Sequence, residues 1–404
     1  MSRLIDHILE VMKRWEAKYY HADYAKLRSE HLALQGDQKR VRALPVLGRD
    51  ELRTVLIFKP DEIGDCLYSL PALKLLRAAL PQARFFLVCQ KKTAPIFERT
   101  GLVDEIATIN VKTTFRKFNR FSVPETLRKF TAAEFDVGIF LRSYPGYFRQ
   151  FLKFPCRIQI HPRDPRMKSK SVVQPFVSLW TEPRQHQAVQ MTEIVEPLTA
   201  TKVSRDQIQF PTFQFSDSDR AGAKQLFERK PESFIVVHPF ADFETRQYVY
   251  WNEVLRWMKD RFRVPIVVVG GPRDPLLPLP NDILQTQGKF NLGQTAFLIS
   301  QSDVFLGNLS GPVHLAGALG VPNVTMMSGH SAPVEWAPFG DSLVLRADVG
   351  CAPCHLRSCT TYQLACVRSL NPLKIMPHLE AFLSSRLGKR GTRPKPDTTT
   401  EVIF

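Results

Sequence analysis

Short apolar runs alternate with amphipathic stretches from residue 54 onward. The runs at 54–58, 84–89 and 136–141 consist mostly of aliphatic and aromatic residues, without polar alternation. Such runs are typical of strands buried on both faces of a parallel sheet, and the stretches between them predict crossover helices. A second series starts at 234–238, with strands expected at 265–270, 303–307 and 323–327 and helices at 251–262, 294–301 and 312–319. The pattern predicts an α/β protein with two such units.

The domain organisation follows from where this pattern starts and stops. Before residue 51, apolar residues at three- and four-residue steps predict an amphipathic helix followed by a polar linker. The last residues are rich in proline and lysine, so we expect them to be disordered. The predicted parts are a helix and linker (1–50), an α/β domain (51–200), an interdomain segment (201–232), a second α/β domain (233–387) and a disordered tail (388–404).

Charge indicates the kind of partner. The 404 residues include 55 Lys and Arg against 39 Asp and Glu, a net charge of +16. Between residues 111 and 185 there are 15 basic and 5 acidic residues, interleaved with aromatic ones. A solvated basic face would explain this stretch most simply, but it also suits an anionic glycolipid or membrane surface. Because no nucleic-acid-binding motif accompanies it, we expect no nucleic acid partner.

The first candidate for chemistry is the segment KPDEIGDCL, residues 59–67, between the first strand and its helix. Gly64 would let the backbone approach a ligand closely. Asp65 lies where the helix amides begin, so its carboxylate should stay ionised and able to accept a proton. A simple helix cap is the alternative for Asp65.

Three further turns could bind a phosphate. In GNLSGPVHLA, residues 307–316, Ser310 can cap a helix, Gly311 permits a tight turn and Pro312 suits the first helical turn. The amides from Ser310 to Val313 would then form an anion site. Arg246, in the loop that follows His238, could clamp a phosphate, although a solvated surface arginine is nearly as good an explanation. A short glycine turn, Gly270–Gly271, follows another predicted strand.

These segments in this order resemble the ADP-heptose:lipopolysaccharide heptosyltransferases, glycosyltransferase family nine, from about residue 54 to 387. The resemblance is carried by KPDEIGDCLYSLPALKLLR, HQAV at 186–189, HPFADFETRQYVYW, VVVGGPRD and GNLSGPVHLAGALGVP. It implies a GT-B fold, in which two Rossmann-like domains face a central cleft. The amino-terminal domain would bind the acceptor and the carboxyl-terminal domain the nucleotide-sugar.

The resemblance also implies roles for individual residues. Asp65 takes the position of the catalytic base of an inverting transfer that requires no cofactor. Arg246 stands where the family usually has a lysine that neutralises the donor phosphates. The implied donor-binding residues are His238, Arg246, Gly270, Gly271, Asn308, Ser310, Gly311, Pro312, Val313 and His314, and the implied acceptor-binding residues are Lys59, Gly64 and Arg142.

One position departs from the family. The family reads Asn-Asp-Ser-Gly-Pro in its donor-binding turn, and here the acidic position is Leu309. A leucine accepts no hydrogen bond from a sugar hydroxyl. Either Asn308 or another group does this work, the donor sugar differs from heptose, or activity is impaired. Two alternatives therefore stay open beside the transferase: a catalytically silent glycan-binding or scaffold relative, and a nucleotide-sugar epimerase, which the Gly64–Asp65 turn argues against.

Four of the seven cysteines gather in residues 351–366: Cys351, Cys354, Cys359 and Cys366. Four thiolates can build a tetrahedral structural zinc or iron site, and reduced cysteines or a labile disulfide are the alternatives. In the autotransporter heptosyltransferases, which resemble this chain, four cysteines hold iron.

Location and assembly can be predicted only in outline. Asp6 and Glu10 interrupt the amino-terminal helix, so it does not read as a secretory signal, and no run reaches the ~18 apolar residues of a membrane span. We expect a cytoplasmic protein, peripheral on the cytoplasmic face of the inner membrane. The amino-terminal helix would contact the membrane, a second subunit in a homo-oligomer, or its own domain.

Overall fold

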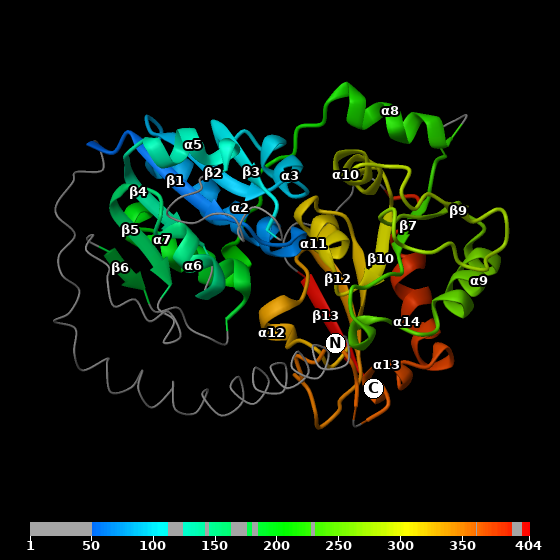
Figure 1. The fold of residues 1–404 in the computed structure, drawn as a ribbon. Coiled ribbons are helices and arrows are strands. Elements are labelled where there is room, and N and C mark those ends of the chain that lie inside the picture. The colour runs from blue at the N-terminus through cyan, green and yellow to red at the C-terminus, as the bar shows by residue number, and fades with distance from the viewer. Residues whose placement is uncertain are drawn as a thin grey trace, which may run out of the picture.

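A computed structural model gives the fold of the chain (Figure 1). It describes residues 51–111, 124–141, 145–162, 176–179, 185–227, 231–360, 362–389 and 398–404. The predicted amino-terminal helix and linker lie outside these residues, as do ten of the fifteen basic residues between 111 and 185. Within the described residues, no helix combines the length and apolarity needed to cross a membrane.

The first domain is built on a six-stranded parallel sheet in the order β3-β2-β1-β4-β5-β6. Its strands are β1 (Thr54–Lys59), β2 (Arg84–Gln90), β3 (Glu105–Ile109), β4 (Phe135–Phe140), β5 (Cys156–Pro162) and β6 (Phe176–Leu179). Its helices are α2 (Ile63–Ala79), α3 (Ala94–Glu98), α5 (Glu125–Ala132), α6 (Pro145–Phe151) and α7 (Gln187–Thr199). The order reverses between β1 and β4, as in a Rossmann sheet, so the turn after β1 lies at a switch point where ligands bind.

The second domain repeats this topology with a seven-stranded parallel sheet, β13-β12-β11-β10-β7-β8-β9. Its strands are β7 (Ile235–His238), β8 (Ile266–Val268), β9 (Leu284–Gln285), β10 (Val304–Asn308), β11 (Asn323–Met327), β12 (Asp341–Arg346) and β13 (Thr398–Ile403). Its helices are α9 (Trp251–Phe262), α10 (Leu292–Ser300), α11 (Gly311–Ala318), α12 (Pro333–Trp336), α13 (Ala365–Arg368) and α14 (Pro372–Ser384). The switch point lies between β7 and β10, so the loops after these two strands are placed together.

The segment between the domains is more ordered than its composition suggested. It contains a 3₁₀ turn, η3 (Arg205–Gln207), and helix α8 (Asp217–Leu226), which packs on α10. Arg99 at the end of α3 forms a two-pronged ion pair with Asp219 of α8. This pair ties the first domain to the segment that leads into the second.

The prediction of a disordered tail is wrong at its end. Residues 398–403 form β13, the outer strand of the second sheet, which pairs with β12 along its whole length. The Phe404 amide donates to the carbonyl of Arg346 at 2.9 Å, and the Phe404 ring packs into the second apolar core. Composition hid this strand because TTTEVI is short and follows a proline- and lysine-rich segment.

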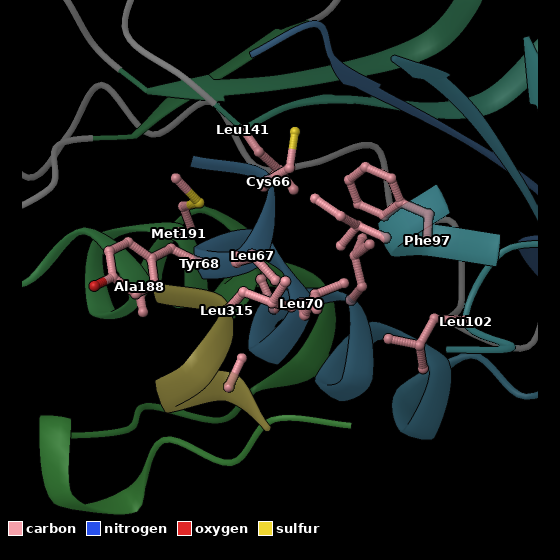
Figure 2. Packing of buried hydrophobic residues seen from close by; sticks show 14 of the residues in the cluster. Cys66, Leu67, Tyr68, Leu70, Phe97, Leu102, Leu141, Ala188, Met191 and Leu315 are labelled. Carbon is pink, nitrogen blue, oxygen red and sulfur yellow. The ribbon is translucent and has the colours of Figure 1, made fainter. Parts of the chain in front are cut away.

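The two domains meet through α2 and α11. One apolar cluster contains buried residues from both, among them Leu67, Leu70 and Leu315. Figure 2 shows Leu315 of α11 beside the leucines of α2. Because each of these helices starts at the switch point of its own sheet, this packing brings the two candidate turns face to face.

Candidate active site

Two glycines allow the two helix starts to approach each other. A side chain at Gly64 would place its Cβ 2.7 Å from Cδ2 of His314, and one at Gly311 would place its Cβ 2.8 Å from Cβ of Ile63. Both contacts cross the domain boundary. The sequence suggested that Gly64 lets the backbone approach a ligand and that Gly311 permits a tight turn; in the structure both glycines allow the two domains to pack closely.

Asp65 and Arg246 act on each other electrostatically across this boundary. Asp65 lies in the first turn of α2 and is half-buried. Arg246 ends the short 3₁₀ turn η4 (Glu244–Arg246) in the loop after β7. Burial lowers the pKa of Arg246, and the carboxylates of Asp65 and Asp242 oppose that effect. The carboxylate predicted as a base and the cation predicted as a phosphate clamp therefore share one site, although they come from different domains.

Lys59, predicted to bind the acceptor, lies beneath the turn that carries Asp65. Its side chain is entirely buried, pairs with the buried Asp61 at 2.8 Å, and donates to the carbonyl of Leu141 at 2.9 Å. Gln90 donates to the carbonyls of Pro60 and Asp61. Lys59 therefore holds the turn that carries Asp65 in place, and we call such a buried supporting group a brace. In the sequence, the pattern Lys-x-Asp at the end of a buried strand is the feature that indicates this role.

Asn308, predicted to bind the donor, is also a brace in this structure. It is fully buried, and its Oδ1 accepts hydrogen bonds from the Tyr248 amide (3.2 Å) and from Nε1 of Trp251 (3.1 Å). Its Nδ2 donates to the carbonyl of Pro239 at 3.0 Å. In this structure the side chain of Asn308 therefore bonds to the protein's own groups.

Leu309 itself points into the protein. Only 5% of it is exposed, and it belongs to the apolar cluster that joins the two domains. At this position the chain has replaced a polar contact by packing between the domains.

Ser310, His238 and Asp274 form a chain of contacts beside the turn. Oγ of Ser310 lies 3.3 Å from Nδ1 of His238, and Nε2 of His238 lies 3.9 Å from Asp274. Burial lowers the pKa of His238 to about 4, with Asp274 and Asp242 opposing this, so the ring is neutral at pH 7. The amide of Gly271 donates to Asp274 at 2.7 Å, and Gly270 packs against the same carboxylate. These residues lie together as predicted, but the Gly271 amide already has an acceptor.

The start of α11 offers fewer free amides than the sequence suggested. Pro312 has no N–H group, and the amide of the buried Val313 donates to the carbonyl of Ser310 at 3.2 Å. Only Ser310 and Gly311 remain as N–H donors for an anion in the predicted turn. An anion bound here would need additional positive charge from side chains.

Tyr68 is a residue of this site that the sequence did not reveal. Its hydroxyl, on α2, shares a 2.5 Å hydrogen bond with Nδ1 of His314 on α11. Burial and the charge of Arg246 lower the pKa of His314 to about 3, so the imidazole is neutral. His186 packs edge-on against Tyr68, and its Nε2 donates to the carbonyl of Ala337 at 2.9 Å. This network fixes the face of α11 that lies against Gly64.

The four clustered cysteines lie in the same part of the second domain. Cys351, Cys354 and Cys359 are partly exposed and Cys366 is buried; none forms a disulfide. Burial raises the pKa of Cys354 and of Cys366, and the neighbouring thiols add to both shifts. Across the described residues, no three His, Cys, Asp or Glu side chains are arranged as a metal site. The remaining predicted residue, Arg142, lies outside the described residues.

Residues 174–365 match the family model of glycosyltransferase family 9 (heptosyltransferase). A Haemophilus influenzae protein provisionally named a glycosyltransferase is 20% identical over 316 residues, which are 72% of this chain and 87% of that protein.

Solved structures show the same fold. A family 9 glycosyltransferase of Veillonella parvula superimposes with a TM-score of 0.66 at 18% identity, covering 83% of this chain and 98% of that one. The ADP-heptose lipopolysaccharide heptosyltransferase II of E. coli gives 0.61 at 18% identity, covering 82% and 99%. The predicted GT-B fold and the resemblance to family 9 are thereby confirmed, and the chain is a glycosyltransferase.

Proposed function

We propose that this glycosyltransferase moves heptose from ADP-heptose, with inversion, to an anionic glycan of the cell envelope such as a lipopolysaccharide core. The observation that supports this most strongly is the meeting of Asp65 and Arg246 beside the start of α11, at the switch points of both sheets. An inverting transfer needs two such groups: a base that takes the proton of the acceptor hydroxyl, and a cation that stabilises the leaving phosphate group.

The proposed step uses this chain's own residues. The acceptor hydroxyl oxygen attacks the anomeric carbon and forms the new C–O bond, while Asp65 takes the hydroxyl proton. The bond from that carbon to the diphosphate oxygen breaks, and its electron pair leaves with the nucleoside diphosphate. Arg246 and the amides of Ser310 and Gly311 would stabilise the charge that develops on the leaving group.

The acceptor and the cellular location rest on the basic stretch between residues 111 and 185. Its excess of ten positive charges suits a phosphorylated glycolipid at the cytoplasmic face of the inner membrane. We propose peripheral association there, with the amino-terminal helix as a contact to the membrane or to a second subunit.

A structural metal at Cys351, Cys354, Cys359 and Cys366 is part of the proposal. The donor set is right for zinc or iron. Besides burial, the thiols of Cys351 and Cys366 raise the pKa of Cys354, and those of Cys351 and Cys359 raise the pKa of Cys366. The metal would stiffen the segment at 351–366 and take no part in sugar transfer. Metal analysis of the purified protein and of a Cys351→Ser, Cys354→Ser variant tests this, because a specific site loses its metal in the variant.

The buried Leu309 favours one other function. A relative that has lost the polar contact to the donor sugar could bind a nucleotide or glycan without turnover, as a scaffold. The transferase has the better support, because the packing that buries Leu309 leaves Asp65 and Arg246 acting on one another.

The test is a turnover assay with ADP-heptose and lipopolysaccharide-core acceptors, combined with thermal stabilisation by ADP and ADP-heptose. Asp65→Asn should lower kcat by about 10²- to 10⁴-fold and leave donor binding unchanged, since it removes only the base. Asp260→Asn, an exposed aspartate on α9, is the matched control and should have normal activity. Donor binding without turnover in the natural chain would favour the scaffold, and turnover that survives Asp65→Asn would contradict the assigned base.

A further inference from the structure

The cysteine-rich loop forms one wall of the site around Arg246. The Cys354 amide donates to the carbonyl of Gly329 at 2.9 Å, and the His355 amide donates to that of His330 at 3.1 Å. Two further bonds tie the loop to the buried Thr245: its amide donates to the carbonyl of Arg357, and its hydroxyl to that of Leu356. Hydrogen bonds therefore hold the loop both to Thr245 of η4 and to the segment at 329–330.

This attachment places a second guanidinium beside Arg246. Cζ of Arg357 lies 4.6 Å from the ring centroid of Phe243, and Cζ of Arg246 lies 5.2 Å from the same centroid. Arg357 is exposed and Arg246 half-buried. Nε of Arg246 donates to Nδ1 of the buried His330 at 3.2 Å, which leaves its two terminal nitrogens available.

Besides burial, the charge of Arg357 lowers the pKa of Arg246, so the two cations repel each other, and an anion bound between them would relieve that repulsion. Among the described residues, no carboxylate oxygen lies within ion-pairing distance of either guanidinium, although Asp65 and Asp242 act on Arg246 from farther away. His330 is held neutral by burial, which lowers its pKa to about 3. The pair thus has the charge and exposure of an anion site, since the fork of an arginine matches a phosphate group.

We infer that Arg357, delivered by the cysteine-rich loop, forms with Arg246 a two-guanidinium site for a diphosphate. The inference rests on the proposed function and extends it by naming a residue that the sequence gave no reason to choose. It also explains how the site binds a diphosphate with few backbone N–H donors. Pro312 has no N–H group, and the amides of Val313 and Gly271 already have acceptors.

The diphosphate could come from the nucleotide donor or from a phosphorylated acceptor. The donor is the better choice, because both arginines belong to the second domain and lie beside the loop after β7, at its switch point. The segment at 351–366 would then control donor binding as well as local rigidity.

The experiment is calorimetric titration of the full-length protein with ADP, AMP, inorganic pyrophosphate and a phosphorylated lipopolysaccharide-core fragment. The variants are Arg357→Gln, Arg357→Lys, Arg246→Gln and, as the matched control, Arg368→Gln, an exposed arginine of the same region. We expect Arg357→Gln to weaken ADP and pyrophosphate binding by about 10- to 100-fold, as Arg246→Gln does, and Arg368→Gln to change neither. Arg357→Lys should retain part of the affinity, because it keeps the charge and loses the fork.

The outcomes separate the inference from the proposed function. Normal ADP and pyrophosphate affinity in Arg357→Gln, with a loss in Arg246→Gln, overturns the pair and leaves the transferase in place. Binding of pyrophosphate but not of ADP, lost in both variants, supports the pair and contradicts the donor. A loss confined to the core fragment overturns the donor assignment of Arg357. A melting temperature of Arg357→Gln equal to that of the natural chain shows that the effect does not come from unfolding.

Discussion

The turn after β1 and the turn after β10 occupy equivalent places in the two sheets, but different chemistry holds them. The first rests on a buried ion pair, Lys59 and Asp61, with Lys59 also bound to the carbonyl of Leu141. The second rests on one neutral amide, Asn308, which bonds to three groups around it. An ion pair in the interior is stable only while both members are present, whereas a neutral hydrogen-bond network can lose its bonds one by one.

The two turns differ in whether buried charge lies beneath them. The turn that carries Asp65, the proposed base, is held by an ion pair in which the charges of Lys59 and Asp61 offset each other. The turn of α11, where we propose that the anionic donor binds, is held without a buried charge. The repeated fold thus holds one turn with an ion pair and the other with neutral hydrogen bonds.

The largest loss of stability is expected when one member of the Lys59–Asp61 ion pair is replaced. Lys59→Met leaves the carboxylate of Asp61 buried without its cation and should lower the free energy of unfolding by about 3–5 kcal/mol. Urea denaturation measures this. The double variant Lys59→Met, Asp61→Leu should recover much of the loss, and a double variant as unstable as the single one would show that the pair is not the brace.

A smaller loss is expected from the neutral brace. Asn308→Ala leaves the Tyr248 amide, Nε1 of Trp251 and the Pro239 carbonyl without their shared partner, at a cost of about 2–3 kcal/mol. Asn308→Asp keeps the two bonds to Oδ1 and loses the one to Pro239. If the two variants unfold at the same urea concentration, the bonds do not act separately and the contrast between the braces fails.

The contact between the two turns can be tested next. Gly64→Ala would place a methyl group 2.7 Å from His314 and should cost about 1–3 kcal/mol, because α2 and α11 must move apart. Transferase activity should fall more than stability suggests, since Asp65 moves with α2. Gly350→Ala, where a methyl group would meet no atom within 4 Å, is the control and should leave both unchanged.

The last effect is absent at pH 7 and emerges in acid. His238 and His314 have native pKa values of about 4 and 3, and an unfolded histidine titrates near ~6.5. Below pH ~6.5 the unfolded chain binds protons that the native chain does not, so stability falls as the pH falls toward those native values, by up to ~1.4 kcal/mol per pH unit for each ring. Urea denaturation at several pH values measures the slope of unfolding free energy against pH. His314→Gln should reduce this slope by the equivalent of one proton, while His378→Gln, at an exposed histidine, should leave it unchanged. A slope in His314→Gln equal to that of the natural chain would contradict a neutral His314.

Much of the fold could be predicted from the sequence because its signals are local. The runs at 54–58 and 303–307 formed parallel strands, and the turns after them lie at the switch points, as the βαβ pattern requires. Strand β13 was missed because a parallel edge strand depends on a partner, β12, that is more than fifty residues away.

The features of the site also fall into two groups, those that the sequence predicts and those that only the tertiary structure shows. The sequence by itself determined that Asp65, Arg246 and the turn at 310–314 stand at the ends of strands, since this depends only on the order of strands and helices. Only the tertiary structure decided that Lys59 and Asn308 face inward, that Gly64 and Gly311 serve the contact between domains, and that Arg357 lies beside Arg246. Those outcomes depend on which side chains from distant segments pack against each other. Burial and charge pairing across such contacts produce no periodic pattern in the sequence, so the sequence does not predict them.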